Sequence, residues 1–163
     1  MRATLHGVIV VDTRYEGVVD VSASAEDAFA LLADVGRSGA HFPAVDRLDP
    51  VDEAGRWRWK IKERGIGPVR MRAVYDAIYV SDPTALTVDW EPPHRGAGDM
   101  ESYGSWRVER RGSGARLHFT ARTVVRVPAP GIMRRMVEAF AKEETIKLKK
   151  EYLQRIAATL GVA

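Results

Sequence analysis

The sequence of 163 residues predicts an α+β domain, in which a curved antiparallel sheet of six to seven strands wraps around one long C-terminal helix. Three observations predict this class. Residues 46–127 form an almost continuous series of strand patterns separated by turn-forming residues. Two short helical segments stand between the first strand and that series. A helical pattern then runs from about Ile132 to Leu160, and only this helix is long enough to cover the sheet.

The length of the chain is that of one domain with one core. We place this domain at residues 15–161. Residues 1–14 are treated as an N-terminal extension that could add a strand, because residues 2–11 include the β-branched run VIVV.

The first elements are a strand and two short helices. From Tyr15, the segment YEGVVDVSA alternates apolar and polar side chains as a strand does. The period becomes helical in SAEDAFALLADV, where Ser24 is the expected N-cap. Gly36 and Gly39 are expected to end this helix, and AHFPAV to form a second short helical turn.

The remaining strands are expected near 47–53, 55–64, 68–80, 84–91, 101–110 and 115–127. In such a meander, alternate connections lie at opposite ends of the sheet. The connections GIGP, PPHRGAGDM and PAPG therefore share one end. Because this set contains the longest loop, we expect any opening between sheet and helix there.

The stretch RWRWKIK, residues 56–62, shows how the two faces of the sheet differ. Successive strand residues point to opposite faces, so its tryptophans face one side and its cations the other. The outer face of the sheet mixes basic residues with Asp89 and Glu91. A phosphate-binding track would need one charge sign and exposed aromatic rings, so we expect no nucleic-acid partner.

The inner face carries an unusual number of rings with polar groups, which need partners when buried. A tightly packed aromatic core explains any single ring equally well. Small residues among the rings favour an amphipathic cavity lining for the set. The expected lining residues are Phe42, Trp57, Trp59, Met71, Tyr75, Tyr79, Trp90, Tyr103, Trp106, Phe119, Met133, Met136, Val137 and Phe140. Tyr103 has the opposite parity to Trp106 and needs a bulge to face inward.

Several kinds of site are not expected. The chain has no cysteine, and its four histidines lack metal-ligand spacing, so we expect neither a metal nor a cofactor. No G-x-S-x-G motif of a hydrolase occurs. The run VIVV is too short for a membrane span or a secretion signal, and we expect a cytoplasmic protein without an integral membrane segment.

Glu144 is the candidate for acid–base chemistry, because it falls on or near the apolar face of the long helix. A partly desolvated carboxyl group there would have a raised pKa. The alternative is a surface ion pair with Lys147, one turn away. The basic segment KLKKEYLQR is interpreted as a solvated helix face, with docking on a partner or membrane as the other interpretation.

The element order resembles the START-related helix-grip superfamily, which includes Bet v 1-like proteins, polyketide cyclases and a carbon-monoxide-dehydrogenase type. The segments that carry the resemblance are VDVSASAEDAFALLADV with HFPAV, IGPVRMRAVYDAIYVSDP, GSWRVERRGSGARLHFTARTVV and the final helix. The superfamily's usual proline before the first helix is replaced here by SASAED, and Phe29 stands where a tryptophan is common. The resemblance implies a cavity between sheet and long helix for lipids, quinones, polyketides or other apolar molecules.

Two functions follow from these observations. The first is binding or transport of an apolar, partly oxygenated small molecule by a monomer or homodimer. The second is catalysis of the polyketide aromatase/cyclase or dehydratase type by acid–base groups in the same cavity. The first is favoured, because no catalytic constellation can be assembled from the sequence. An accessory domain that docks on a partner protein or a membrane is the third.

Overall fold

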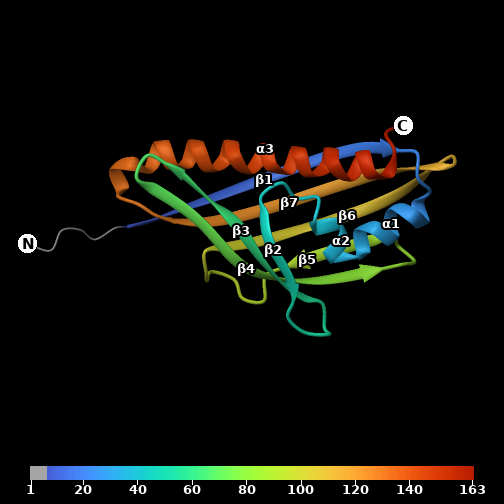
Figure 1. The fold of residues 1–163 in the computed structure, drawn as a ribbon, viewed down its shortest axis with the longest axis horizontal. Helices are drawn as coiled ribbons and strands as arrows, with labels where there is room; N and C mark the ends of the chain where they lie inside the picture. The colour runs from blue at the N-terminus through green and yellow to red at the C-terminus, as the bar shows by residue number, and fades with distance from the viewer. Residues whose placement is uncertain (1–6) are drawn as a thin grey trace, which may run out of the picture.

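The computed structural model describes residues 7–163, and its strands form one seven-stranded antiparallel sheet in the order β1-β7-β6-β5-β4-β3-β2 (Figure 1). This confirms the predicted meander. The strands are β1 (Val8–Val21), β2 (Val45–Pro50), β3 (Arg56–Ile66), β4 (Val69–Asp82), β5 (Thr87–Glu91), β6 (Met100–Arg111) and β7 (Gly114–Pro128).

Strand β1 is longer than the sequence patterns predict. It pairs with β7 without interruption, from Val8 opposite Pro128 to Val21 opposite Ala115. Ile9 and Val11 point to the core and are 1% exposed, so the inward alternation continues through the part assigned to an extension. The boundary placed at residue 14 therefore falls inside a strand. The rest of the extension, residues 1–6, lies outside the described residues.

Two short helices follow β1, as predicted, but the second begins earlier than expected. Helix α1 (Ala25–Ala33) starts at Ser24, whose hydroxyl accepts the Asp27 N–H at 3.1 Å. Helix α2 (Val35–Gly39) contains the two glycines that were expected to break a helix. The reason is Asp34, which accepts the Arg37 N–H at 3.1 Å and so caps a new helix.

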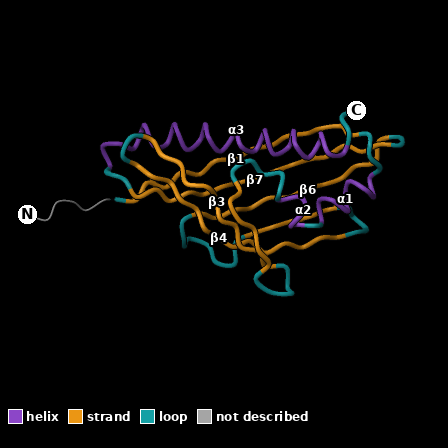
Figure 2. Tube along the Cα trace, viewed as in Figure 1, coloured by secondary structure: helices purple, strands orange, loops and turns teal. Residues whose placement is uncertain are grey.

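A short 3₁₀ turn, η1 (Gly131–Met133), leads into the long helix α3 (Arg134–Leu160). Helix α3 lies along β1 on the concave face of the sheet (Figure 1). Its C-terminal end is bonded to the segment after β1, where the Ser22 N–H donates to Gly161 at 2.7 Å and the Ala23 N–H to Leu160 at 3.0 Å. Figure 2 shows α1 and α2 near this same end of α3.

The core beneath α3 consists of two groups of buried side chains. The larger lies under α1, α2 and the C-terminal half of α3, and it contains most of the aromatic rings. The smaller lies under the start of α3, around Ile9, Val127 and Val137. On the opposite face of the sheet, Arg56 and Arg58 both pair with Asp76, at 2.6 and 2.8 Å. The cations of RWRWKIK thus join in cross-strand ion pairs, while Trp59 is buried.

Candidate ligand-binding site

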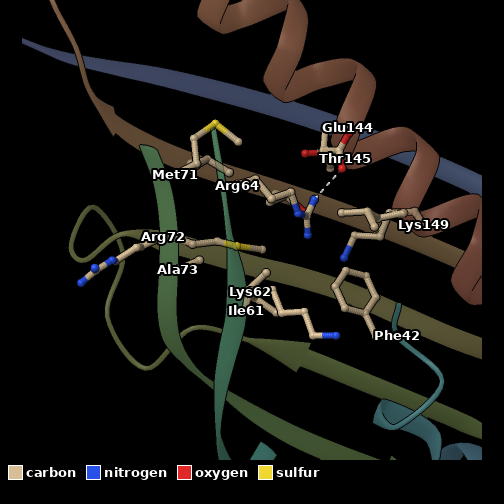
Figure 3. A pocket seen from close by; sticks show the side chains of 14 residues that line it. Phe42, Ile61, Lys62, Arg64, Met71, Arg72, Ala73, Glu144, Thr145 and Lys149 are labelled. Carbon is tan, nitrogen blue, oxygen red and sulfur yellow. Dashed lines mark hydrogen bonds and ion pairs between the residues drawn. The ribbon is translucent and has the colours of Figure 1, made fainter. Parts of the chain in front are cut away.

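A cavity of about 60 Å³ lies between α3 and the strands β3, β4, β6 and β7 (Figure 3). It lies toward the end of the sheet where GIGP, PPHRGAGDM and PAPG connect the elements, as predicted. Exposed Lys62 and Arg72 contribute to its lining, so its rim reaches the surface. The lining residues are Phe42, Ile61, Lys62, Arg64, Met71, Arg72, Ala73, Met100, Thr123, Val125, Glu144, Thr145, Leu148 and Lys149.

An ion pair crosses this cavity. Arg64 Nη1 lies 3.0 Å from Glu144 Oε1, and both side chains are largely buried (Figure 3). Strict alternation from Trp59 and Ile61 would place Arg64 on the outer face. A β-bulge between Ile61 and Arg64 shifts the register against β4 and turns the arginine inward. Glu144 therefore faces the cavity, but it pairs with Arg64 rather than with Lys147.

Lys149 is the second cationic group of the cavity, and the sequence patterns did not predict it. Its side chain descends from α3 toward Phe42, with Nζ 5.1 Å from the ring centroid (Figure 3). The residue is only 7% exposed. Burial lowers the pKa of its ammonium group from 10.5 to about 8. A lysine in this environment exchanges its proton close to neutrality.

The position of Lys149 also corrects the interpretation of KLKKEYLQR as one solvated face. Lys147, Lys150 and Arg155 are exposed, but Lys149 points into the core. Buried residues of α3 recur every four positions at Val137, Ala141, Lys149 and Leu153. This stripe was the available signal for Lys149, although the residue's charge argued against it. The surface left to a docking face is correspondingly less basic.

A second, smaller cavity of about 30 Å³ adjoins the first, and both are lined by Phe42 and Lys149. Its walls hold most of the rings predicted to face inward. Those rings are Trp59, Tyr75, Tyr79, Trp90, Trp106 and Phe119, with Tyr152 added from α3.

These rings pack mainly against one another. Trp106 stacks on Phe119 with centroids 4.4 Å apart, and Tyr152 meets Phe119 edge-on at 5.6 Å. The polar groups find partners inside the set, since the Trp59 Nε1–H donates to the Tyr79 hydroxyl at 3.0 Å. The Trp90 Nε1–H donates to Ser102 at 3.2 Å. The aromatic set is thus a bonded core around a small void, and the ligand-sized opening lies beside it.

The buried tyrosines are proton donors at neutral pH. Burial raises the pKa of Tyr152 to about 12. It also raises the pKa of Tyr75 and Tyr79 well above the usual value of 10.0. These groups therefore stay protonated and can donate hydrogen bonds to oxygen atoms of a ligand.

The remaining predicted lining residues lie elsewhere. Trp57 is half-buried against the larger core and lines neither cavity. Met133 and Val137 belong to the smaller core group. Met136 is 44% exposed, because the buried stripe of α3 runs through Val137 and Ala141 instead. Phe140 is half-buried and lines neither cavity.

Tyr103 lies on the outer face, because β6 and β7 pair without a bulge. Its ring is held between Arg95 and Arg122, with centroid distances of 5.4 and 5.1 Å. Its hydroxyl donates to the buried carboxylate of Glu101 at 2.8 Å. Glu101 also accepts the Gly96 N–H and pairs with Arg126. These contacts fix the β5–β6 loop to the outer side of the sheet.

Two further properties concern residues 7–163 only. Within this range no three His, Asp or Glu side chains gather as a metal site would require. No helix in the same range combines the length and the apolar character needed to cross a membrane.

Residues 12–152 match the sequence profile of a family described as polyketide cyclase/dehydrase and lipid transport. Among proteins with curated functions, none matches the sequence.

Solved structures share the fold at low sequence identity. A START superfamily protein from Mycobacterium smegmatis has a TM-score of 0.63 at 17% identity, covering 90% of this chain and 98% of its own. The Zhui aromatase/cyclase from Streptomyces sp. R1128 has a TM-score of 0.57 at 19% identity, covering 93% and 99%. Truncated norcoclaurine synthase from Thalictrum flavum has a TM-score of 0.58 at 14% identity, covering 94% and 96%. The architecture is the helix-grip fold.

Proposed function

Because the chain belongs to the polyketide cyclase/dehydrase and lipid transport family, we propose that it binds an apolar, partly oxygenated small molecule between the sheet and α3. The observation that carries the proposal is the cavity of about 60 Å³, whose walls combine apolar side chains with a few polar groups. Ligand sites in proteins have this composition, since apolar area supplies affinity and sparse polar groups supply orientation.

The cavity must widen to hold such a guest. A volume of about 60 Å³ holds only a few water molecules, at roughly 10–15 Å³ for each. Met71 and Met100 stand in its walls. Methionine side chains are unbranched and adapt to irregular shapes, so they can make room without a change in the backbone.

Two ligands of equal chain length, decanoate and decanol, test the proposal. We expect isothermal titration calorimetry to show one binding site for at least one of them. Ala73→Leu should weaken that binding by about tenfold or more, because the larger side chain fills the cavity that Ala73 lines. Val74→Leu is the matched control, since Val74 is the next residue and is 46% exposed on the other face. Binding that Ala73→Leu leaves unchanged, or no binding of either ligand, would contradict the proposal.

A cyclase is the second candidate, and Lys149 is the observation that favours it. Its pKa of about 8 suits an amine that accepts and returns a proton near neutrality. Removing a general base costs about 10²–10⁴ in turnover. With a poly-β-ketone thioester as substrate, a cyclase should lose turnover to this extent in Lys149→Met while still binding the substrate. A binding protein should show no product with either form.

A further inference from the structure

Two polar groups face the larger cavity without a partner in the protein. Thr123, on β7, is 2% exposed, and its hydroxyl oxygen has no hydrogen-bond partner among residues 7–163. The side chain of Lys149, on α3, makes no hydrogen bond or ion pair with the residues in that range. Both line the same cavity, from the sheet side and from the helix side. Buried polar groups in proteins are nearly always bonded, and buried charges are nearly always paired.

The charges around the cavity are unbalanced. Four cationic side chains line it, namely Lys62, Arg64, Arg72 and Lys149, against the single carboxylate of Glu144. That carboxylate is already bonded to Arg64 at 3.0 Å. Lys149 is therefore left without a counter-charge where water is largely excluded. The site is suited to an anionic group and would repel a cation.

The rest of the lining is apolar and fits a hydrocarbon body. Ile61 and Met71 come from β3 and β4, Met100 and Val125 from β6 and β7, and Leu148 from α3. Leu148 immediately precedes Lys149 on the helix. One molecule could thus place its apolar part among these side chains and its charged group against the lysine.

We propose that the natural ligand is an apolar molecule with one ionised oxygen group, such as a carboxylate, phenolate or enolate, whose charge pairs with Lys149 and which accepts a hydrogen bond from Thr123. This inference rests on the proposed function and adds the chemical class of the ligand. The anion satisfies both unpartnered groups at once. A neutral alcohol or ester would leave the lysine without a counter-charge.

Comparing decanoate with decanol by titration calorimetry at pH 7 tests the class of ligand. The wild-type protein should bind decanoate at least about tenfold more tightly, because only the acid supplies a charge-assisted hydrogen bond. Equal affinity for the two ligands overturns this inference and leaves the proposed function standing. Failure of both to bind overturns the two together.

Variants locate the preference. Lys149→Met should lower decanoate affinity to that of decanol while leaving decanol within about threefold, and Thr123→Val should lower decanoate affinity by a few fold. Lys150→Met is the control, since Lys150 is the neighbouring exposed lysine, and it should leave both affinities unchanged. If Lys149→Met weakens acid and alcohol equally, the lysine is structural and the inference fails. Thr123→Val keeps the size of the side chain, and it decides the matter if Lys149→Met does not fold.

Discussion

At the scale of single residues, the packing of the aromatic core depends on one position that cannot carry a side chain. Gly104 lies on β6 directly opposite Trp90, and its missing side chain leaves the space that the indole ring fills. A Cβ atom there would also stand 2.6 Å from the carbonyl oxygen of Thr120. The ring and the backbone would both have to move, so the indole position is set by the absence of an atom.

Gly104→Ala should therefore destabilise the protein by about 1–3 kcal/mol, the usual cost of overpacking a core. Urea unfolding followed by tryptophan fluorescence measures the change. Gly131→Ala is the control, because a Cβ atom at Gly131 has no atom within 4 Å. Equal unfolding midpoints for the two variants would show that the core yields without cost.

At the scale of elements, the β5–β6 loop depends on Glu101, which is 4% exposed. Desolvation acts to raise the pKa of this carboxyl group. Hydrogen bonds from Gly96, Arg126 and Tyr103 outweigh it and lower the pKa to about 2. The folded pKa lies below the unfolded value of 4.5, so this group stabilises the fold above pH 4.5. That contribution is lost as the pH falls from 4.5 toward 2.

Glu101→Gln should cost about 1–3 kcal/mol at pH 7, because the amide cannot replace the charged bond to Arg126. The difference between wild type and variant should shrink as the pH falls below 4.5, when the wild-type carboxyl group takes up a proton. Urea unfolding at pH 7, 4.5 and 3 measures it. Glu53→Gln, at an exposed turn residue, is the control and should follow the wild type throughout. A constant difference across this range would refute the role of the charge.

The elements also show what sequence patterns can and cannot predict. Strand order, the Ser24 cap and the inward side of RWRWKIK follow from periodicity and turn chemistry, which are local. The inward turn of Arg64 depends on one extra residue in β3 relative to β4, which is a property of the pair. The second helix was misplaced because Asp34 provides a cap that outweighs two glycines.

The candidate site was reached only in part for the same reason. Glu144 and Met71 were found from face patterns, and the structure places both on the larger cavity. Lys149 was assigned to solvent because lysines are seldom buried, and only the packed helix shows the exception. The rings were grouped correctly on one face, but whether they enclose space depends on how they pack against each other.

At the scale of the whole molecule, Lys149 couples stability to alkaline pH. Its folded pKa of about 8 lies below the ordinary value of 10.5, so the unfolded chain binds more protons between these values. Stability should therefore rise with pH across this window. Below pH 8 the folded protein bears the full cost of the buried charge.

Lys149→Met should then be more stable than wild type at pH 7 by up to about 3 kcal/mol, and this advantage should decrease at pH 9.5. Urea unfolding at the two pH values measures it, below the range in which the tyrosines ionise. The groups on the same two cavities are common to both proteins, so they cancel in the comparison: Lys62, Arg64, Arg72, Tyr75, Tyr79, Glu144 and Tyr152. Lys150→Met should behave as wild type. Parallel curves for wild type and Lys149→Met would contradict the assignment.

The two ends of α3 are held by different forces. Backbone hydrogen bonds from Ser22 and Ala23 fasten its last turn, whereas the Arg64–Glu144 ion pair connects its middle to β3 over the cavity. Dissolved ions screen the second attachment and leave the first unaffected. Ionic strength should therefore set how fast a guest enters and departs: brine loosens the rod at its mid-length while its tail stays attached, and exchange quickens without any loss of fold.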